Sequence, residues 1–290
     1  MLRTKCPLLS VAYICHNMDD FLKESLLSVW DFADEIIVVD NVSEDKTLDI
    51  LYSFPQNKLK IISRKFEGRT YQDVVKQKRN LCLDLAQGVW TLFVDPDEVY
   101  MQKDLQWLCQ AIQKTDKVHF RYHSIQFWKD FYHVITGPHW DDTQERLIKN
   151  LPGLRYDKFA FSVSVDGEVL SKKYGKDFLD GIYWCKEEEI QIYHYGMCIT
   201  EEKIRRKLRN YLLSDNPVVN EGNVESFLDR HPYFSGDFNQ PRHGLRGLWI
   251  AGFDDERIRE RILRFEGHHP ETMLETVERA KYLKASDCWE

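Results

Sequence analysis

The residues best suited to do chemistry are the acidic ones in the segment Asp95-Pro96-Asp97-Glu98, which directly follows an apolar run from Trp90 to Val94. If that run is a strand of an open parallel sheet, its carboxyl end is where such sheets bind ligands. Two carboxylates one residue apart can hold a hard divalent cation, Mn²⁺ or Mg²⁺, and the cation can in turn bind a diphosphate. The same residues also suit a plain acidic turn, because aspartate and proline are both common in turns.

A second polar segment, Asp40 to Thr47, begins where another apolar run ends. We expect the Asp40 carboxylate to lie at the same edge of the sheet as Asp95, where it could accept hydrogen bonds from a ribose or from a base N–H. Ser43 and Asp45 also fit a simpler role, as caps of the helix that follows. The two roles are compatible.

Four short apolar runs, rich in β-branched residues and bounded by polar ones, predict parallel strands that are buried on both faces. They are Leu9 to Cys15, Glu35 to Asp40, Leu59 to Ser63 and Trp90 to Val94. Apolar residues at helical spacing from Phe21 to Val29 and from Tyr71 to Leu85 predict crossover helices between them. This alternation is typical of βαβ units, so we expect an α/β fold with a mostly parallel, Rossmann-like sheet flanked by helices.

The second of these helices carries Arg79 and Asn80. Helical spacing places them near the rim of the sheet, away from the buried side that Val75 and Cys82 form. A cation and an amide could reach a nucleotide there. An ordinary solvated basic face is the alternative.

The chain beyond Asp97 has a less regular pattern. We expect a helix from Lys103 to Gln113, then an antiparallel strand at the edge of the sheet where Val118, Phe120 and Tyr122 alternate with polar residues. Aromatic residues crowd residues 127–140, where burial is the default and sugar or base stacking is the alternative.

From Thr200 onward the pattern is helical and charged, and it continues with amphipathic segments over Asp254 to Phe265 and Glu271 to Leu283. We therefore place a soft boundary near residue 200, with an α/β domain over residues 1–200 and a helical C-terminal region over residues 201–290.

Composition excludes several classes of protein. The 290 residues are 43% hydrophobic and 30% charged, which suffices for a real core and excludes a disordered or collagen-like chain. The formal net charge of -7 argues against a protein that coats nucleic acid, because that binding needs a basic field. The cysteines stand singly, without a zinc or redox spacing, and fit reduced thiols.

No apolar run approaches the ~18 residues that span a bilayer, and Met1 to Ser10 lacks the apolar segment of a signal peptide, so we expect a cytoplasmic protein. A location peripheral to a membrane is the alternative, through basic and aromatic residues near the C-terminus that also suit a solvated helix face. That candidate surface comprises Arg242, Arg246, Trp249, Arg257, Arg259, Arg261 and Arg264.

Together these segments resemble the family 2 glycosyltransferases of the GT-A fold. The matching order and spacing comprise Ser10 through Asn17, Phe32 through Asp40 with Ser43, Asp45 and Thr47, the pair Arg79-Asn80, and Asp95 through Glu98. The match is firm over about residues 8 to 100. The resemblance implies that Ala12, Asp40 and Arg79 contact the nucleotide of a sugar donor. It also implies that Asp95 faces the ribose or the metal, and that Asp97 binds the metal on the diphosphate.

Two later segments extend the resemblance. Tyr193-His194-Tyr195-Gly196 is similar to a strand end whose histidine completes the metal or diphosphate site in several relatives, which implies His194 as a third metal ligand. A packed, hydrogen-bonded histidine is the alternative. Lys203 and Arg206, just beyond, could contact phosphate or could be surface charges. The segment Gly267 to Glu271, with His268 and His269, implies either an acceptor or donor contact or only a turn before a helix.

The catalytic base is where the chain departs from the family pattern. Inverting transfer needs a carboxylate to deprotonate the acceptor hydroxyl. The His-Glu pair of many relatives corresponds here to Phe161-Ser162. Asp166 is our first choice of base, with Glu168, Asp141 and Asp142 as rivals. Asp166-Gly167 is equally a strong hairpin-turn signal.

We therefore expect a metal-dependent, inverting glycosyltransferase that moves a hexosyl group from a nucleotide-diphosphate donor, a UDP-sugar, to the hydroxyl of a glycan or other acceptor. One alternative is a non-catalytic nucleotide-sugar-binding protein, which the altered His-Glu pair allows. The other is a nucleotidyltransferase, which Cys15-His16-Asn17-Met18 disfavours because it is not the Gly-rich loop that cradles a triphosphate. A modified base in DNA is a less favoured acceptor, given the acidic chain.

Overall fold

The computed structural model describes residues 9–136, 144–156, 163–169, 182–215, 219–231 and 262–284. The first half of its main sheet consists of four parallel strands in the order β4-β1-β2-β3. They are β1 (Leu9–Cys15), β2 (Glu35–Asp40), β3 (Leu59–Ser63) and β4 (Trp90–Val94). The four strands expected from the sequence, and their parallel pairing, are confirmed.

The central strands of this half are buried on both faces, which is why their sequences are continuous apolar runs. Val11 of β1 and its partner Leu92 of β4 belong to one hydrophobic cluster. The next residues along, Ala12 and Phe93, belong to a second cluster on the opposite face. Because residues that point to either face are apolar, these strands have no polar face, and their sequences do not alternate between polar and apolar residues.

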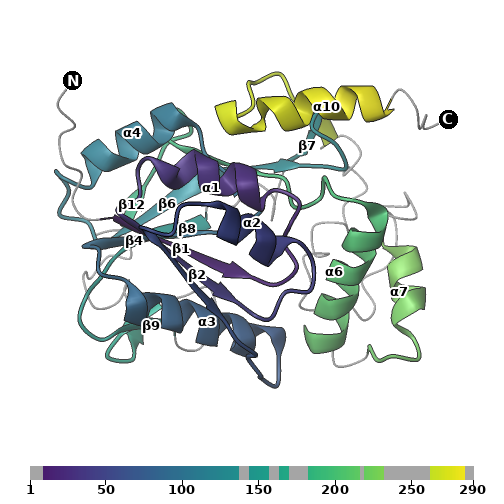
Figure 1. Cartoon of the computed structure of the whole chain (residues 1–290), viewed down its shortest axis with the longest axis horizontal. Helices are drawn as coiled ribbons and strands as arrows, with labels where there is room; N and C mark the ends of the chain where they lie inside the picture. Colours follow the sequence, from purple (N-terminus) through teal and green to yellow (C-terminus); the bar gives the residue numbers. More distant parts are fainter. Residues whose placement is uncertain are drawn as a thin grey trace.

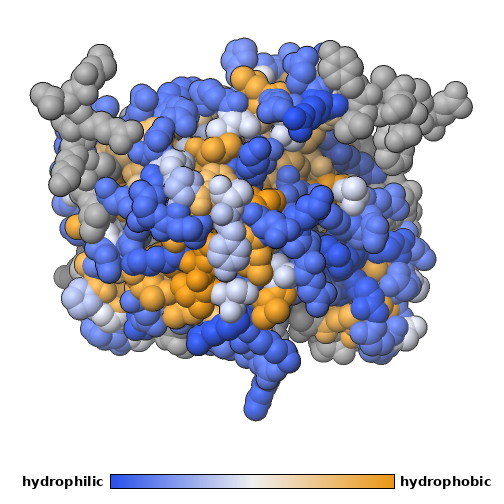
Figure 2. Space-filling view, in the orientation of Figure 1, coloured by the Kyte–Doolittle hydropathy of each residue, from blue (hydrophilic) through white to orange (hydrophobic). Residues whose placement is uncertain are grey.

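Helices cover both faces of the sheet (Figure 1). The first cluster is completed by α1 (Leu22–Trp30), α2 (Thr47–Ser53) and α4 (Gln102–Ala111), and the second by α3 (Tyr71–Leu85). Helix α3 begins with a capping box between Thr70 and Asp73, which satisfies backbone N–H groups that would otherwise lack partners. Figure 2 shows apolar side chains gathered between α2 and α3. Ile61 and Ile62 belong to the edge strand β3 and are half-buried.

The second half of the sheet is mixed in direction. Strand β8 (Gln144–Lys149) pairs antiparallel with both β4 and β6 (His119–Phe127), and β7 (His133–Ile135) and β14 (Ile262–Arg264) continue the sheet beyond β6. The expectation of an edge strand after residue 117 is therefore wrong, because β8 returns between β4 and β6 and gives β6 neighbours on both sides.

The helix expected up to Phe265 is also wrong at its end, where β14 is a strand. Residues 254–261 lie outside the described part of the chain, as do all members of the candidate membrane surface except Arg264.

Two short strands bring a distant segment to β6 and β5. Strand β13 (Gln191–His194) runs parallel to β6 and antiparallel to β5 (Glu98–Val99), and β12 (Ile182–Trp184) pairs with the start of β6. A separate small sheet contains β9 (Leu154–Tyr156), β10 (Val163–Val165) and β11 (Glu168–Val169). The pairing of β13 with β5 places His194 beside the acidic segment Asp95 to Glu98.

The C-terminal region contributes α6 (Glu201–Asp215), α7 (Val224–Arg230) and α10 (Leu274–Lys284), the last preceded by a 3₁₀ turn (Glu271–Met273). The apolar stripe of α6, which includes Ile204 and Leu208, packs on α7 as its spacing predicts. Thr276 of α10 donates a hydrogen bond to Glu24 of α1 over 2.6 Å, which ties this region to the core. None of the helices within the described ranges is long and apolar enough to cross a membrane.

Aromatic residues of the middle segment are packed where the structure describes them. Phe127, Trp128 and Phe131 are buried, as the default for large aromatic side chains predicts. His139 and Trp140 lie outside the described residues.

Candidate active site

The loops that follow β1 and β2 are joined at the carboxyl edge of the sheet. The backbone N–H of Asn17 donates to Ser43 Oγ over 2.8 Å. The N–H of Met18 donates to Thr47 Oγ1 over 2.8 Å. Asn17 has a φ of 55° and Val42 one of 53°, a conformation that costs a β-branched residue energy and that the surrounding hydrogen bonds must hold. The polar segments that follow β1 and β2 therefore meet at this edge.

Asp40, the last residue of β2, fixes the loop that follows this strand. Its side chain is fully buried, and its two oxygens accept hydrogen bonds from the N–H of Ser43 (3.0 Å), the hydroxyl of Ser43, and the hydroxyl of Ser63 (2.6 Å). These bonds give Asp40 a positioning role in the loop. Its direct contact with a nucleotide stays a prediction.

Asp95, directly after β4, faces two arginines. Its Oδ2 accepts a hydrogen bond from Arg146 Nη2 over 2.6 Å, and its Oδ1 lies 3.8 Å from Arg79 Nη2. Arg146 also pairs with Glu98. Burial acts to raise the pKa of Asp95, but the charges of Arg146 and Arg79 outweigh it and hold that pKa below its usual value. At Glu98 burial prevails over Arg146 and raises the pKa to about 7.

Arg79 does not lie at the rim as its helical position predicted. Only 3% of it is exposed, and its guanidinium lies over the rings of Phe93 (5.8 Å) and Tyr156 (5.3 Å). The faces of aromatic rings attract a guanidinium, and here the rings occupy the space where helical periodicity alone would place solvent. The alternative of an ordinary solvated basic face is therefore wrong for Arg79, and its contact with the nucleotide, next to Asp95, stays a prediction.

Asp97 lies beside His194 and Lys207. The backbone C=O of Asp97 accepts a hydrogen bond from Tyr195 N–H over 2.9 Å, which extends the β5–β13 pairing and brings His194 Nε2 to 3.4 Å from Asp97 Oδ1. The other ring nitrogen of His194 is hydrogen-bonded to Gln126 of β6. Lys207 Nζ, from α6, donates to Asp97 Oδ2 over 3.1 Å.

The charges in this cluster reinforce one another. Burial acts to raise the pKa of Asp97, but Lys207 and His194 outweigh it and hold that pKa far below its usual value. Burial acts to lower the pKa of Lys207, and the Asp97 carboxylate overcomes it and raises that pKa. Asp97 is therefore ionised and Lys207 protonated near neutral pH.

Gly196 leaves space next to this cluster. A Cβ atom at Gly196 would come within 2.6 Å of both Asp97 Oδ2 and His194 Nε2, and within 3.0 Å of Lys207 Nζ. Real Cβ atoms do not approach other atoms so closely, so only glycine leaves these three groups where they are. The result is a small cradle lined by a carboxylate, an imidazole and an ammonium.

A divalent cation fits this cradle better than it fits Asp95. Asp97 and His194 offer an oxygen and a nitrogen donor of the kinds that Mn²⁺ accepts, whereas Asp95 is paired with arginines. Throughout the part of the chain that the structure describes, no group of three or more His, Cys, Asp or Glu side chains could hold a metal ion. The residues present thus fit a cation with two protein ligands, and participation of Asp95 stays a prediction.

Ala12 and Asp166 lie apart from this cluster. Ala12 is fully buried in β1, where it pairs with Ile37 and Phe93. Asp166 and Gly167 have φ values of 52° and 79° and form the exposed turn between β10 and β11, so the hairpin signal is confirmed.

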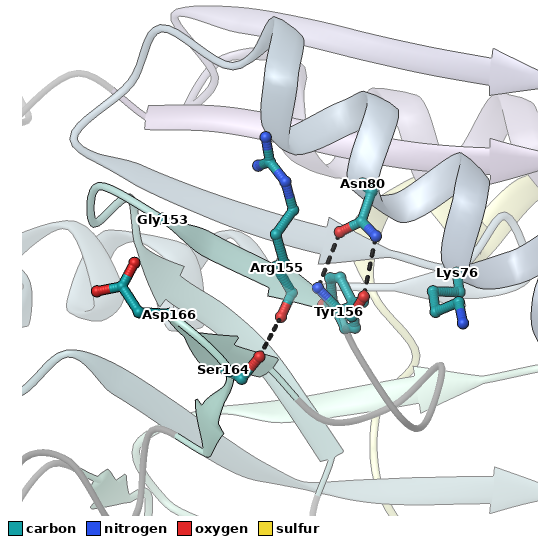
Figure 3. A pocket seen from close by; sticks show the side chains of 8 residues that line it. Lys76, Asn80, Gly153, Arg155, Tyr156, Ser164 and Asp166 are labelled. Atoms are coloured by element: carbon teal, nitrogen blue, oxygen red, sulfur yellow. Dashed lines mark hydrogen bonds between the residues drawn. The ribbon is translucent and has the colours of Figure 1, made fainter.

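Asp166 also borders a surface hollow of about 390 Å³ (Figure 3). Ser164 and Tyr156 line the hollow from the small sheet, and Asn80 and Lys76 line it from α3. Asn80 donates to the Tyr156 carbonyl over 2.9 Å and accepts from the Tyr156 N–H over 2.8 Å, which fixes β9 to the helix. The rivals Asp141 and Asp142, the pair Phe161-Ser162 and the side chain of Glu168 lie outside what the structure describes.

The structure adds Arg146, Gln126 and Lys207 to the residues considered from the sequence. Two basic side chains, Lys203 and Arg206, were considered as phosphate contacts. Lys203 contacts Asp19 (2.6 Å) and Asp20 (2.8 Å), and Arg206 is exposed. Lys207 follows Lys203 by one helical turn, so the two lysines share a face of the helix. This spacing was the signal in the sequence that could have indicated Lys207 as a site residue.

His269 is a packing residue. Its Nδ1 is hydrogen-bonded to Tyr195 Oη over 2.8 Å, and its ring stacks on Phe127 with centroids 5.1 Å apart. The turn that precedes the C-terminal helix is confirmed, and His268 is exposed beside it.

Open α/β sheets bind their ligands outside the carboxyl ends of the strands, which is where these acidic and basic side chains lie. Comparison with known proteins shows the family to which the chain belongs. Residues 10–169 match the model of glycosyl transferase family 2. The chain therefore belongs to this family, and its mostly parallel sheet flanked by helices is the GT-A fold that the resemblance implied.

Two curated relatives are similar over part of the chain. The SPbeta prophage-derived glycosyltransferase SunS of Bacillus subtilis is 24% identical over 71% of this chain and 44% of its own length. The UDP-Glc:alpha-D-GlcNAc-diphosphoundecaprenol beta-1,3-glucosyltransferase WfaP of Escherichia coli is 30% identical over 43% of this chain and 47% of its own. The chain thus spans less than half the length of these relatives.

Solved structures show more distant similarity. TarS of S. aureus in complex with UDP-GlcNAc has a TM-score of 0.44 at 17% identity and covers 85% of this chain and 79% of that one. Glucosyl-3-phosphoglycerate synthase from Mycobacterium tuberculosis in complex with Mn²⁺ and UDP-glucose has a TM-score of 0.42 at 14% identity and covers 72% and 78%.

Proposed function

We propose that the chain transfers a hexosyl group from a UDP-sugar to the hydroxyl of a glycan or other acceptor, with inversion and with a divalent cation. The observation that carries this proposal is the Asp97–His194 pair beside Gly196 at the carboxyl end of β4. Family membership supports glycosyl transfer, and the donor named for WfaP supports uridine as the nucleotide.

The proposed roles at the donor follow from charge and position. Asp97 and His194 would hold Mn²⁺ or Mg²⁺, and the low pKa of Asp97 keeps it ionised, as metal ligation requires. A bound divalent cation stabilises the negative charge on a leaving nucleoside diphosphate. Arg79 and Asp95 are proposed to contact the nucleotide, together with Asp40 at the end of β2 and Ala12 within β1.

Asp166 is the proposed catalytic base. Among the candidate carboxylates, it is the one whose side chain the structure describes, and it lies at the rim of a hollow that an acceptor can enter. A base within reach of an acceptor hydroxyl removes its proton as the new glycosidic bond forms. Water entering in place of the acceptor would be activated in the same way.

Asp166→Asn tests this role with little disturbance to the turn, because asparagine tolerates positive φ as well as aspartate does. We expect donor hydrolysis to fall by about 100-fold while nucleotide affinity is unchanged. Steady-state hydrolysis and calorimetric titration measure the two quantities. Unchanged hydrolysis would leave Asp166 as a turn residue only and remove it from the mechanism.

The proposed function as a whole is tested with a panel of UDP-, GDP- and dTDP-sugars incubated with the full chain in Mn²⁺ or in EDTA. We expect slow release of free nucleoside diphosphate from a UDP-sugar in Mn²⁺, falling by more than about tenfold in EDTA, because the leaving diphosphate then lacks its counter-charge. Binding of a nucleotide sugar without any turnover would favour the non-catalytic binding protein. Turnover that EDTA leaves unchanged would overturn the metal assignment.

A further inference from the structure

Helix α6 lies beside the carboxyl edge of the sheet (Figure 1). It carries two lysines one helical turn apart, Lys203 and Lys207. Lys203 contacts the two carboxylates of Asp19 and Asp20, in the loop after β1. Lys207 contacts a single carboxylate, that of Asp97. The helix is therefore held to the edge of the sheet by ion pairs at two points, and these points differ in what surrounds them.

Lys207 reaches into the cradle beside Gly196. Its Nζ lies 3.1 Å from Asp97 Oδ2 and 3.4 Å from the Gly196 carbonyl oxygen. Its side chain keeps 27% of its surface exposed, whereas Asp97 keeps 9%. Part of the Lys207 side chain is thus open to solvent, while its ammonium faces a candidate metal ligand.

One carboxylate cannot serve a divalent cation and an ammonium equally well. Both cations would lie within a few ångströms of Asp97 and would repel each other strongly in a partly buried site. A donor diphosphate relieves this repulsion because its two negative charges and that of Asp97 together balance the divalent cation and the ammonium. Lysine suits such an exchange, since its ammonium is a single charge on a flexible stem that can move from one oxygen to another.

We propose that Lys207 is a diphosphate-binding residue of the donor site: its ammonium balances Asp97 before the donor binds, and moves onto the donor diphosphate when a divalent cation occupies Asp97. This inference rests on the proposed function. It adds a second cation to that site, one contributed by the C-terminal helix.

A purely structural role does not explain Lys207 as well. The apolar stripe of α6, with Ile204 and Leu208, already packs the helix on its neighbours, and Lys203 already ties it to the β1 loop. If Lys207 only held α6 in place, residue 196 would not need to be a glycine, whose missing side chain leaves room for the Lys207 ammonium.

The test compares Lys207→Met with wild type in two binding measurements on the full chain. The first is calorimetric titration in saturating Mn²⁺ with UDP, GDP or dTDP, whichever binds wild type most tightly, and with the matching monophosphate. We expect the variant to bind the diphosphate about tenfold more weakly and the monophosphate almost unchanged, because one charge-assisted contact to the outer phosphate is lost. The second is Mn²⁺ binding without nucleotide, measured by electron paramagnetic resonance.

Mn²⁺ affinity should change in the opposite direction. Without the ammonium, Asp97 faces the metal alone, so we expect Lys207→Met to bind Mn²⁺ several-fold more tightly, about fivefold or more. A variant that merely folds poorly would lose affinity for both ligands. Lys207→Gln provides a second neutral side chain, and Lys207→Arg should retain most of the diphosphate affinity because it keeps the charge.

Lys203→Met is the matched control, since it removes a lysine from the same helix face one turn away. We expect it to lower the melting temperature without changing the ratio of diphosphate to monophosphate affinity. Equal losses for the two nucleotides in Lys207→Met, or weaker Mn²⁺ binding, would overturn the inference. Failure of wild type to bind any of the diphosphates, with or without Mn²⁺, would instead refute the proposed function.

Discussion

Asp97→Asn is expected to lower turnover of the sugar donor by about a thousandfold, which corresponds to ~4 kcal/mol of lost transition-state stabilisation. Asparagine keeps the size of the side chain and one acceptor oxygen, but it removes the charge that attracts both His194 and Lys207. A neutral amide is a poor ligand for a divalent cation beside an ammonium. The measurement is release of nucleoside diphosphate in saturating Mn²⁺, together with Mn²⁺ affinity by electron paramagnetic resonance.

Asp104→Asn is the control for this substitution. Asp104 is also a buried carboxylate, but it belongs to α4, and its Oδ2 accepts a hydrogen bond from the Gln191 N–H over 3.2 Å. Asp104→Asn should therefore affect stability slightly and turnover hardly at all. Turnover by Asp97→Asn within about threefold of wild type would show that Asp97 does not carry the metal chemistry.

The first half of the sheet could be predicted from the sequence because its strands are buried on both faces. Such strands appear as uninterrupted apolar runs, and runs like Glu35 to Asp40 begin and end where the structure has β2. The strand order in the second half of the sheet could not be predicted from apolar runs. Strands β8 and β14 are partly exposed, and their pairing with β4 and β7 depends on contacts between residues far apart in the sequence.

The acidic residues of the candidate site could be found because they follow a strand directly, but their partners could not. Arg146 comes from β8, and nothing in its local sequence distinguishes it from a surface arginine. Its proximity to Asp95 results from the antiparallel pairing of β8 with β4. The metal role of His194 was implied by family resemblance, and its approach to Asp97 depends on the pairing of β13 with β5.

Two side chains on helices show the same limit. Arg79 was expected at the rim from helical periodicity, which gives the direction of a side chain but not what lies in that direction. Phe93 and Tyr156, from two other strands, cover it. On α6 the periodicity correctly gave the apolar stripe, yet all its charged residues look equivalent until the position of Asp97 is known.

The largest expected effect on stability comes from Arg146→Met, which should lower the free energy of unfolding by about 3 to 5 kcal/mol near pH 8. Arg146 is 5% exposed in its side chain and neutralises two carboxylates, Asp95 and Glu98, of which Glu98 is 2% exposed. Removal of the guanidinium leaves the buried Glu98 and the partly exposed Asp95 with far less counter-charge. Denaturant unfolding followed by circular dichroism measures the difference. Arg155→Met is the control, because Arg155 pairs with Asp84 where both are half exposed, and a pair of that kind contributes only ~0.5 kcal/mol.

The pH dependence of Arg146→Met identifies the cause of the loss. Burial already raises the pKa of Glu98 to about 7, above that of glutamate in an unfolded chain, so the folded protein takes up a proton as the pH falls through that value. Arg146 opposes this rise, and the pKa of Glu98 must therefore be higher still in the variant. Protonation then removes one of the uncompensated charges, and the stability difference from wild type should narrow between about pH 8 and about pH 6. Adding Glu98→Gln to the variant should reproduce that recovery at pH 8, since it neutralises the same group. A difference that stays constant with pH would instead mean that Arg146 stabilises the fold by packing rather than by charge.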